Sequence, residues 1–400
     1  MNRNGNQVNG HDSYVDVIML GVGTCGEDLS LQLLDAGLDV VGIEAALVGG
    51  TCPFHGCLPS KMMVRAANLL KESERINGMS GQASVSSDWR QLAERVSQLT
   101  GGWNDAGAVE RYEKRGGRLI HGEGNLTGPR TVTVGGKSFT ARKGIVIATG
   151  TKPVIPPIPG LEKVNYWITD DIIEAESLPE SAVILGGGAT GCELGQVLAR
   201  FGVKVTIVET DERLLRLEEP EASEKVEEAL ADDDITVYKG TKASEVDLRG
   251  NSIITRLDSG EELSSERLVL STGRMPDLTN LGLESAGLDS SAKFIEVDER
   301  MRAADGIWAM GDVTGKSMFT HVALYQAAII AADILGKAHP PAEYQSVPRV
   351  TFTDPEVGSV GFTESAAREA GLDVVAVTKQ IAATFRGILH GSNGGFIKFI

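Results

Sequence analysis

An internal repeat constrains the fold more than any other feature of this sequence. Segments 15–44 (VDVIMLGVGTCGEDLSLQLLDAGLDVVGIE) and 181–209 (SAVILGGGATGCELGQVLARFGVKVTIVE) follow one pattern. Each has an apolar strand, a G-x-G-x-x-G turn, an amphipathic helix and a second apolar strand that ends in glutamate. The strands are continuously apolar, which is typical of parallel strands buried on both faces. The repeat therefore predicts two βαβ units, each within an α/β domain.

The glycines of each turn have the spacing of a dinucleotide-binding motif. The first permits a tight turn, the second lets the backbone approach a pyrophosphate, and the third lets helix and strand pack closely. The adjoining helix N-terminus offers N–H groups and a partial positive charge to phosphates. Glu44 and Glu209, each 18 residues beyond the third glycine, are placed to accept hydrogen bonds from a ribose. These predictions concern Gly21, Gly23 and Gly26 in the first unit and Gly186, Gly188 and Gly191 in the second.

Composition excludes several classes of function. The formal net charge of −17 argues against a nucleic-acid partner, which would require a basic face. No apolar run approaches the roughly 20 residues of a membrane span. The longest candidate, 321–336, is interrupted by Gln326 and Asp333 and predicts a buried helix. Four cysteines in 400 residues do not form a disulfide scaffold, so we expect a reducing, cytoplasmic setting.

The chain divides at proline-rich connectors. Residues 1–13 are polar and are expected to form a disordered lead. A helical stretch at about 58–115 and a strand at 144–150 precede TKPVIPPIPG at 151–160, which predicts a stiff connection. A second connector, 338–349, opens a region of strands and a helix. The chain ends in the strand-like GGFIKFI, and because a sheet cut there would expose an edge, we expect further chain beyond it.

Cys52 and Cys57 lie five positions apart in GGTCPFHGCLPS, a pattern that allows three interpretations. A structural staple is disfavoured because closing so short a loop gains little entropy. Zinc has ligand types in Cys52, His55 and Cys57 but no second cluster, so no metal is expected. The run after Cys57 predicts an amphipathic helix with Pro59 in its first turn, and a helix N-terminus favours a thiolate. A pair of thiols that opens and closes is therefore favoured.

The other two cysteines are predicted to be packing residues. They are Cys25 in the first glycine-rich turn and Cys192 on the helix of the second unit.

Six motifs resemble, in order, those of the pyridine nucleotide-disulfide oxidoreductases, the flavoprotein family of dihydrolipoamide dehydrogenase, mercuric reductase and the glutathione and mycothione reductases. The resemblance covers nearly all of 14–400. The motifs are GGTCPFHGCLPSK, ATGTKPVIPPIPG, GGGATGCELG, STGRMPD, MGDVTG and FTDPEVGSVGFT.

The resemblance implies two Rossmann-like domains and an α+β dimerisation domain that looks incomplete. An FAD domain would comprise 14–150 and 275–338, an NAD(P) domain 151–274, and a partial interface domain 345–400 of a homodimer. FAD would be held by Glu44 on its ribose, by Asp312 near its ribityl chain and by further residues of the motifs. The cofactor residues implied are Gly50, Thr51, Lys61, Thr149, Gly150, Gly273 and Gly311, beside the two glycine-rich turns.

The second nucleotide is expected to be NAD rather than NADP. Glu209 can bond a 2′-hydroxyl and would repel a 2′-phosphate. Arg213 and Arg216, close by in the sequence, keep NADP as the less favoured alternative.

The resemblance implies a relay in which NADH reduces the flavin, the flavin reduces the Cys52–Cys57 disulfide, and the dithiol reduces a substrate. Cys57 would be the charge-transfer thiol and Cys52 the interchange thiol, with Lys61 and Glu193 forming an ion pair near the flavin and nicotinamide. The substrate would be a small or protein-bound dithiol or disulfide, as in dihydrolipoamide dehydrogenase. Alternatives are a mercuric or low-molecular-weight disulfide reductase and, more distantly, a quinone oxidoreductase or a non-enzymatic flavin sensor.

Two departures from the family pattern stand out. The family's C-terminal His-Pro-x-x-x-Glu motif is not found, since His339 in AHPP precedes the interface region and lacks the glutamate. Residues 53–55, PFH, replace the aliphatic and asparagine residues that are more usual between the cysteines. We hypothesise that His55 stabilises a thiolate or carries its proton; the alternative is a solvated loop residue.

Overall fold

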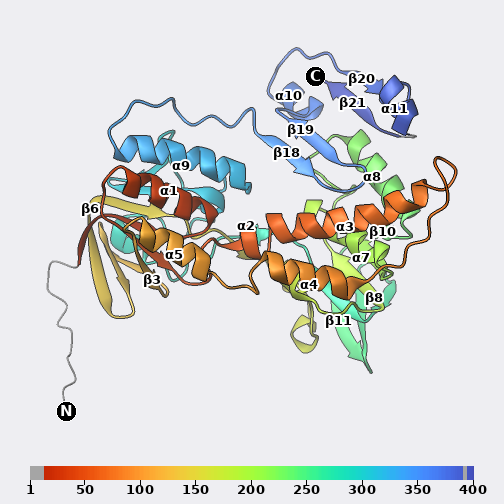
Figure 1. Cartoon of the computed structure of the whole chain (residues 1–400), viewed down its shortest axis with the longest axis horizontal. Coiled ribbons are helices and arrows are strands. Elements are labelled where there is room, and N and C mark those ends of the chain that lie inside the picture. The colour runs from red at the N-terminus through yellow and green to blue at the C-terminus, as the bar shows by residue number, and fades with distance from the viewer. Residues whose placement is uncertain (1–12, 391–393) are drawn as a thin grey trace. The chain divides into compact units, whose positions relative to one another are not determined.

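The computed structural model describes residues 13–390 and 394–400 (Figure 1). The chain forms two compact units, each built from three segments. Unit 1 comprises Met1–Cys57, Thr100–Lys152 and Arg274–Tyr344, and unit 2 comprises Leu58–Leu99, Pro153–Gly273 and Gln345–Ile400. The short strands β7 (Lys152–Pro153) and β15 (Arg274–Met275) lie at two of the crossings. The predicted disordered lead, 1–13, lies outside the described residues except for Ser13.

Unit 1 is built on a mainly parallel sheet in the order β16-β17-β6-β1-β2-β3. Strand β1 pairs in parallel with β2 and β6, as the first βαβ pattern predicts. An antiparallel hairpin, β4 and β5, extends β6 on one side. The strands are β1 (Tyr14–Leu20), β2 (Val40–Glu44), β3 (Arg118–His121), β4 (Asn125–Gly128), β5 (Thr131–Val134), β6 (Lys137–Ile147), β16 (Arg302–Ala304) and β17 (Ile307–Ala309).

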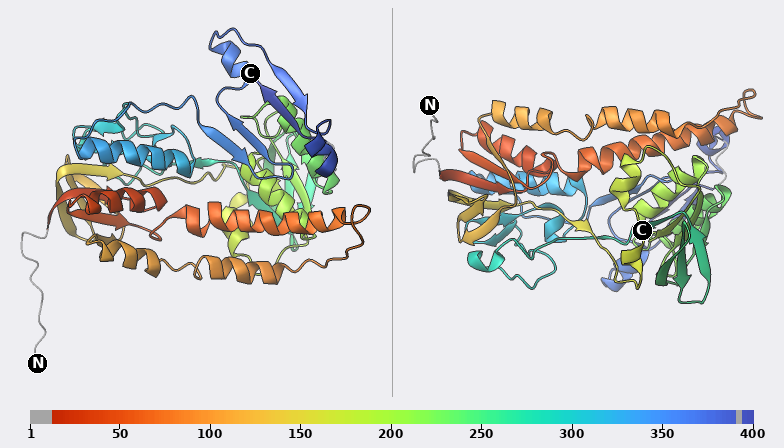
Figure 2. Two further views of the ribbon diagram at one scale, coloured as in Figure 1. Left: turned by 45° about the horizontal axis from the view of Figure 1, so that its top comes forward. Right: turned by 90° about the horizontal axis from the view of Figure 1, so that it is seen from below.

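Both faces of this sheet are covered. Val17 and Met19 of β1 pack into a core that also contains residues of α1, α5 and α9, whereas Ile18 and Leu20 face a second core formed with the hairpin. Helices α1 and α9 lie side by side (Figure 1, Figure 2). The helical elements are α1 (Thr24–Asp35), α2 (Thr51–Phe54), α5 (Ala106–Lys114), α9 (Thr320–Ile334) and the 3₁₀ turns η2 (Leu283–Ala286) and η3 (Gly311–Thr314). The apolar pattern of β1 thus results from burial on both faces.

Unit 2 contains a second parallel sheet in the order β10-β9-β8-β14, beside an antiparallel sheet of β11, β12 and β13. The predicted second βαβ unit is confirmed as β8, α7 and β9. These elements are β8 (Ser181–Leu185), β9 (Lys204–Val208), β10 (Thr236–Tyr238), β11 (Ala243–Arg249), β12 (Ser252–Leu257), β13 (Glu262–Ser265), β14 (Arg267–Leu270), η1 (Leu161–Lys163), α6 (Thr169–Glu174), α7 (Ala189–Arg200) and α8 (Pro220–Asp232).

The remaining elements of unit 2 come from two distant segments. Helices α3 (Cys57–Arg75) and α4 (Trp89–Leu99) form most of the predicted helical stretch, which is interrupted at 76–88 and 100–105. In the residues that the structure describes, the C-terminal region consists of two antiparallel pairs of strands with two short helices. They are β18 (Pro348–Thr351), β19 (Val357–Val360), α10 (Glu364–Glu369), β20 (Val377–Gln380), α11 (Phe385–His390) and β21 (Phe396–Phe399).

The predicted α/β class is therefore confirmed. Helix α9 forms where a buried helix is predicted, but only one face is buried: Gln326 is fully buried, whereas Leu324 and Tyr325 are exposed. Among the helices of the described residues, none is long and apolar enough to cross a membrane.

Candidate active site

The two glycine-rich turns have the backbone geometry that their sequence predicts. The first glycine of each, Gly21 (φ 96°) and Gly186 (φ 110°), lies in the left-handed region that L-residues avoid. A Cβ on Gly26 or Gly191 would clash with the carbonyl oxygen of the first glycine of its own turn. Beside Gly188, by contrast, the space that a Cβ would occupy is open. In each turn, the third glycine packs so tightly that no side chain fits there. The second turn, in addition, has free space next to its middle glycine, Gly188.

Both predicted ribose-binding carboxylates also brace these turns. Glu44 Oε2 accepts a hydrogen bond from Val22 N at 2.7 Å, and Glu209 Oε2 accepts one from Gly187 N at 2.6 Å. The same relation recurs because Glu44 is the last residue of β2 and Glu209 directly follows β9, and each of these strands lies next to its turn. Sequence reasoning assigned these residues to a ligand alone and missed the contact with the backbone.

Two further loops of unit 1 follow the carboxyl ends of neighbouring strands. Thr149 and Gly150 follow β6, and Gly311 and Asp312 follow β17, which pairs in parallel with β6. Parallel α/β sheets bind ligands at this end. No side chain or backbone atom fills the position of a Cβ on Gly150.

Asp312 is held in a largely buried position. Burial raises the pKa of its carboxyl group, and a hydrogen bond from Thr151 Oγ1, 3.1 Å from Oδ2, together with the charge of Arg274, offsets part of that effect. The backbone N–H of Gly311 donates to Oε1 of the buried Gln326 at 2.7 Å. Gln326, which the sequence shows as an interruption of an apolar helix, therefore fixes this loop.

Cys52 and Cys57 lie on consecutive helices. Cys52 is in the single turn of α2, and Cys57 is the first residue of α3, which confirms the predicted helix start. Gly50, the N-cap of α2, approaches the first glycine-rich turn so closely that a Cβ on it would lie 2.8 Å from Gly23 Cα. The cysteine pair is thus anchored beside the first nucleotide motif.

Thr320 brings the two sulfurs to one hydroxyl group. Its Oγ1 lies 3.4 Å from the sulfur of Cys52 and 3.4 Å from that of Cys57. The structure describes both cysteines as thiols. The pKa of Cys52 is raised, first by a hydrogen bond with Cys57 and then by burial, and the hydrogen bond with Thr320 offsets part of that rise.

Sequence reasoning missed Thr320. It begins α9 and lies 268 residues from Cys52 in the chain, in a stretch without a motif. Its backbone carbonyl accepts a hydrogen bond from Cys25 Sγ at 3.5 Å, and burial, followed by the charges of Asp28 and Asp312, raises the pKa of Cys25 to about 12. Such a thiol is protonated at neutral pH and is a weak nucleophile.

Lys61 and Glu193 form an ion pair within unit 2. Lys61 Nζ lies 2.6 Å from Glu193 Oε2, and the Glu193 side chain is 5% exposed. The other carboxylate oxygen accepts a hydrogen bond from the backbone of Phe352 at 2.8 Å. The sequence predicts this pair, whereas its role stays a prediction.

Other residues that the sequence singled out have local partners. The imidazole of His55 stacks on the indole of Trp103, with centroids 6.4 Å apart and planes at 21°. Cys192 is buried and donates to the carbonyl of Gly187 at 3.3 Å. Gly273 (φ 101°) accepts a hydrogen bond from Val154 N at 3.0 Å.

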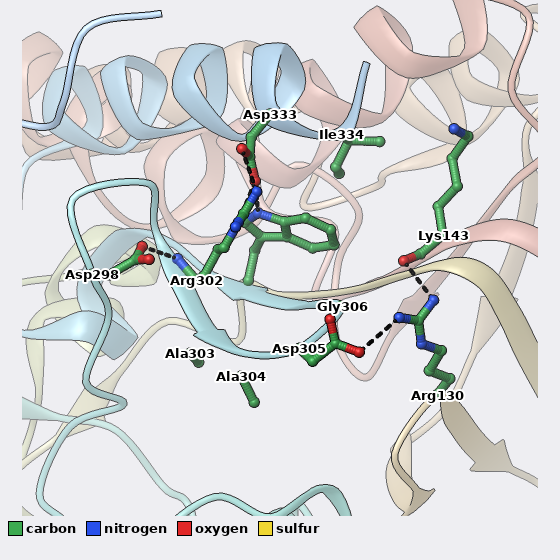
Figure 3. A pocket seen from close by; sticks show the side chains of 11 residues that line it. Arg130, Lys143, Asp298, Arg302, Ala303, Ala304, Asp305, Gly306, Asp333 and Ile334 are labelled. Carbon is green, nitrogen blue, oxygen red and sulfur yellow. Dashed lines mark hydrogen bonds and ion pairs between the residues drawn. The ribbon is translucent and has the colours of Figure 1, made fainter. Parts of the chain in front are cut away.

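A pocket of about 610 Å³ lies at the opposite end of β17 (Figure 3). Four of its charged side chains form ion pairs within the pocket, Arg302 with Asp333 at 2.7 Å and Arg130 with Asp305 at 3.1 Å. Asp305 and Gly306 precede β17, whereas the glycine loops follow the carboxyl ends of the strands. We therefore do not assign the active site to this pocket.

Two family models match the chain. Residues 15–327 match the model described as pyridine nucleotide-disulphide oxidoreductase, and residues 347–400 match the dimerisation domain of the same family. The chain therefore belongs to the pyridine nucleotide-disulphide oxidoreductases, the FAD- and NAD(P)-dependent flavoenzymes that the sequence resembles.

Individual relatives have two different activities by name. The mercuric reductase of Staphylococcus aureus is 31% identical over 396 residues, 97% of this chain and 72% of the relative. The dihydrolipoyl dehydrogenase of Chlorobaculum tepidum is 32% identical over 399 residues, 96% of this chain and 84% of the relative.

A solved structure of the same fold is the HOCl-induced flavoprotein disulfide reductase RclA from Escherichia coli. Its TM-score is 0.85 at 28% identity, covering 96% of this chain and 86% of that one. RclA has also been solved as a Cu(II) complex.

Proposed function

We propose that Cys52 and Cys57 are the redox pair of an NADH-linked disulfide oxidoreductase of the dihydrolipoamide dehydrogenase type. The observation that carries the proposal is the convergence of both sulfurs on the Thr320 hydroxyl, 3.4 Å from each. A hydroxyl between two thiols stabilises whichever is ionised, and the N-terminus of α3 adds a partial positive charge at Cys57.

The exchange with a disulfide substrate then proceeds in two displacements. The Cys52 thiolate attacks one substrate sulfur, forming a mixed disulfide and releasing the other sulfur as a thiolate. The Cys57 thiolate attacks Cys52, which forms the Cys52–Cys57 disulfide and releases the second substrate thiolate. Two electrons pass to the substrate, and the reverse sequence oxidises a dithiol.

The residues present fit an FAD group in unit 1. The turn at Gly21–Gly26, the open side of Gly150 and the buried carboxyl of Asp312 offer partners for phosphates, flavin and ribityl hydroxyls. Residues 14–150 and 275–338 would form this FAD domain. When bound, the flavin and the nicotinamide supply the hydride and electron chemistry.

Residues 151–274 would hold NAD rather than NADP. Glu209 places a carboxylate at the end of β9, where a 2′-phosphate would be repelled. The two arginines that could bind a 2′-phosphate have other partners. The Arg213 guanidinium donates to the carbonyl of Arg216 at 2.7 Å, and the Arg216 guanidinium pairs with Asp211 at 3.0 Å.

The dimerisation-domain match supports a homodimer. We propose that residues 345–400 contribute to its interface and that the enzyme works in the cytoplasm.

Mercury is the second candidate substrate, because the first mercuric relative matches as closely as the dihydrolipoyl dehydrogenase does. Two adjacent thiolates are also soft ligands of the kind that bind soft metal ions. Lipoamide, small disulfides, Hg²⁺ and Cu²⁺ therefore belong in one substrate screen with the NADH-reduced enzyme.

Anaerobic titration with NADH tests the redox pair. We expect uptake of four electrons per subunit and a long-wavelength thiolate-to-flavin band at the two-electron stage. Cys57→Ser should abolish the band and leave a two-electron uptake, while Cys52→Ser should retain the band. Two-electron uptake by the unmodified enzyme would contradict the proposal and favour a quinone oxidoreductase. A full redox response without turnover of any substrate screened would favour a sensor.

A further inference from the structure

Phe352 contacts both members of the Lys61–Glu193 ion pair. Its backbone N–H donates to Glu193 Oε1 at 2.8 Å, while Lys61 Nζ lies over its ring, 4.8 Å from the centroid. Glu193 Oε2 completes the cluster at 2.6 Å from Lys61 Nζ. All three residues belong to unit 2, although Phe352 comes from the C-terminal region and lies 159 residues from Glu193 in the chain.

The backbone of Phe352 is fastened to α7. Gln196, which is 3% exposed, accepts a hydrogen bond from Asp354 N at 2.7 Å and donates to Asp354 O at 3.1 Å. Arg200, with a side chain 4% exposed, reaches the Asp354 carboxylate at 3.1 Å. Together with Glu193, these residues lie on successive turns of one helix and hold 352–354 in place. Displacing the segment would leave buried polar groups without partners, which is costly.

The ammonium group of Lys61 needs more than one partner to be fixed. A lysine side chain is long and flexible, and that of Lys61 is 35% exposed. A cation over the face of an aromatic ring is attracted by the negative charge of that face. The carboxylate of Glu193 and the ring of Phe352 therefore limit the ammonium to one position between them.

We propose that Phe352 is a positioning residue that holds Lys61 for the nicotinamide half-reaction. This inference rests on the proposed function and on the role that the family resemblance implies for the Lys61–Glu193 ion pair in the reaction with the nicotinamide. The ring acts on Lys61, and the backbone N–H acts on Glu193, so one residue of the C-terminal region sets the geometry of both.

The first test compares Phe352→Leu with Phe352→Tyr in the FAD-loaded enzyme. Leucine keeps the backbone N–H and removes the aromatic face, whereas tyrosine keeps the face. We expect Phe352→Leu to slow flavin reduction by NADH about 3- to 30-fold in stopped flow, with KM for NADH and the thiol exchange rate changed less than about twofold. In Phe352→Tyr the flavin should be reduced at the rate of the unmodified enzyme. An equal loss of the flavin-reduction rate in both variants, or a change in KM for NADH alone, would overturn the proposal.

A double-mutant cycle with Lys61→Met separates this inference from the proposed function. If Phe352 acts through Lys61, Phe352→Leu has no further effect in the Lys61→Met background. If the effects of the two substitutions on the rate of flavin reduction were fully additive, the proposed role of Phe352 would be overturned, but not that of Lys61. A normal rate of flavin reduction in Lys61→Met itself would overturn the proposed role of Lys61, and the inference with it.

Lysine acylation provides a readout that does not depend on turnover. In Phe352→Leu, Lys61 should react at least threefold faster with an acylating reagent, measured by mass spectrometry. The internal reference is Lys71, whose ammonium pairs with Asp233 at 3.1 Å. The matched control is Phe362→Leu, at an exposed phenylalanine of the same region. Unchanged reactivity of Lys61 would overturn the proposal.

Discussion

Replacing Thr320 with valine tests the hydroxyl that joins the two cysteines. The valine side chain is similar in shape but cannot donate to sulfur. The hydroxyl oxygen lies 3.4 Å from both sulfurs, and its hydrogen bond lowers the pKa of Cys52. A hydrogen bond to a charged group contributes about 1.5–3 kcal/mol, and we take the lower limit because one hydroxyl proton serves two sulfurs at a long distance. That limit corresponds to about one pKa unit.

The first ionisation of the Cys52/Cys57 pair should therefore move upward by about one unit in Thr320→Val. The sign follows because the lost bond stabilised the thiolate. At a fixed pH below the transition, alkylation by iodoacetamide becomes about tenfold slower. The two thiols titrate as a coupled pair, so the pH profile gives apparent values for the pair.

The assay follows alkylation of the peptide 49–61 by mass spectrometry in the NADH-reduced enzyme between pH 4 and 9. Thr320→Ser keeps the hydroxyl and should match the unmodified enzyme. Cys192 is buried and serves as an unreactive reference. A Thr320→Val profile within about 0.3 unit of that of the unmodified enzyme would refute the reasoning.

Four further substitutions test other parts of the structure. In Gly26→Ala the new Cβ would clash with a carbonyl of the first turn, so this variant should lower the flavin content of the purified protein. Gly191→Ala should leave flavin bound and raise KM for NADH at least tenfold. If both variants changed flavin content and KM equally, the result would contradict two separate nucleotide sites. Lys398→Met removes an ammonium that lies 2.8–3.0 Å from three carboxylates, those of Glu219, Glu221 and Glu364. Chiefly because of Lys398, the pKa of Glu221 lies below its usual 4.5, so this stabilisation is present above pH 4.5 and is lost as the pH falls through the lowered value. The variant should lose about 1–3 kcal/mol in urea unfolding at pH 7 and progressively less as the pH falls through the lowered pKa of Glu221; a loss independent of pH would argue against the ion pairs. His55→Ala should shift the pH dependence of thiol exchange if the imidazole serves a thiolate, and an unmoved profile would leave His55 as a loop residue.

Much of the nucleotide-binding architecture was predictable because its signals are local. A G-x-G-x-x-G turn needs a left-handed φ at Gly21 and at Gly186, and only glycine adopts it without strain. Apolar runs on either side identify the buried parallel strands. The start of α3 at Cys57 was predictable for the same reason, since Pro59 and the apolar spacing are contiguous in sequence.

The contacts that complete the site were decided by tertiary structure. Thr320 and Phe352 carry no motif, and they reach Cys52 and Glu193 across 268 and 159 residues of chain. A hydroxyl or a phenyl ring becomes functional only where packing of α9 or of 352–354 places it. The sequence by itself determined two βαβ units, a pair of thiols at a helix start and the likeness to a flavoenzyme family, because each depends on residues near one another in the chain. Only the folded chain decided which distant hydroxyl contacts the sulfurs and which aromatic ring holds Lys61, because such contacts depend on how separate elements pack.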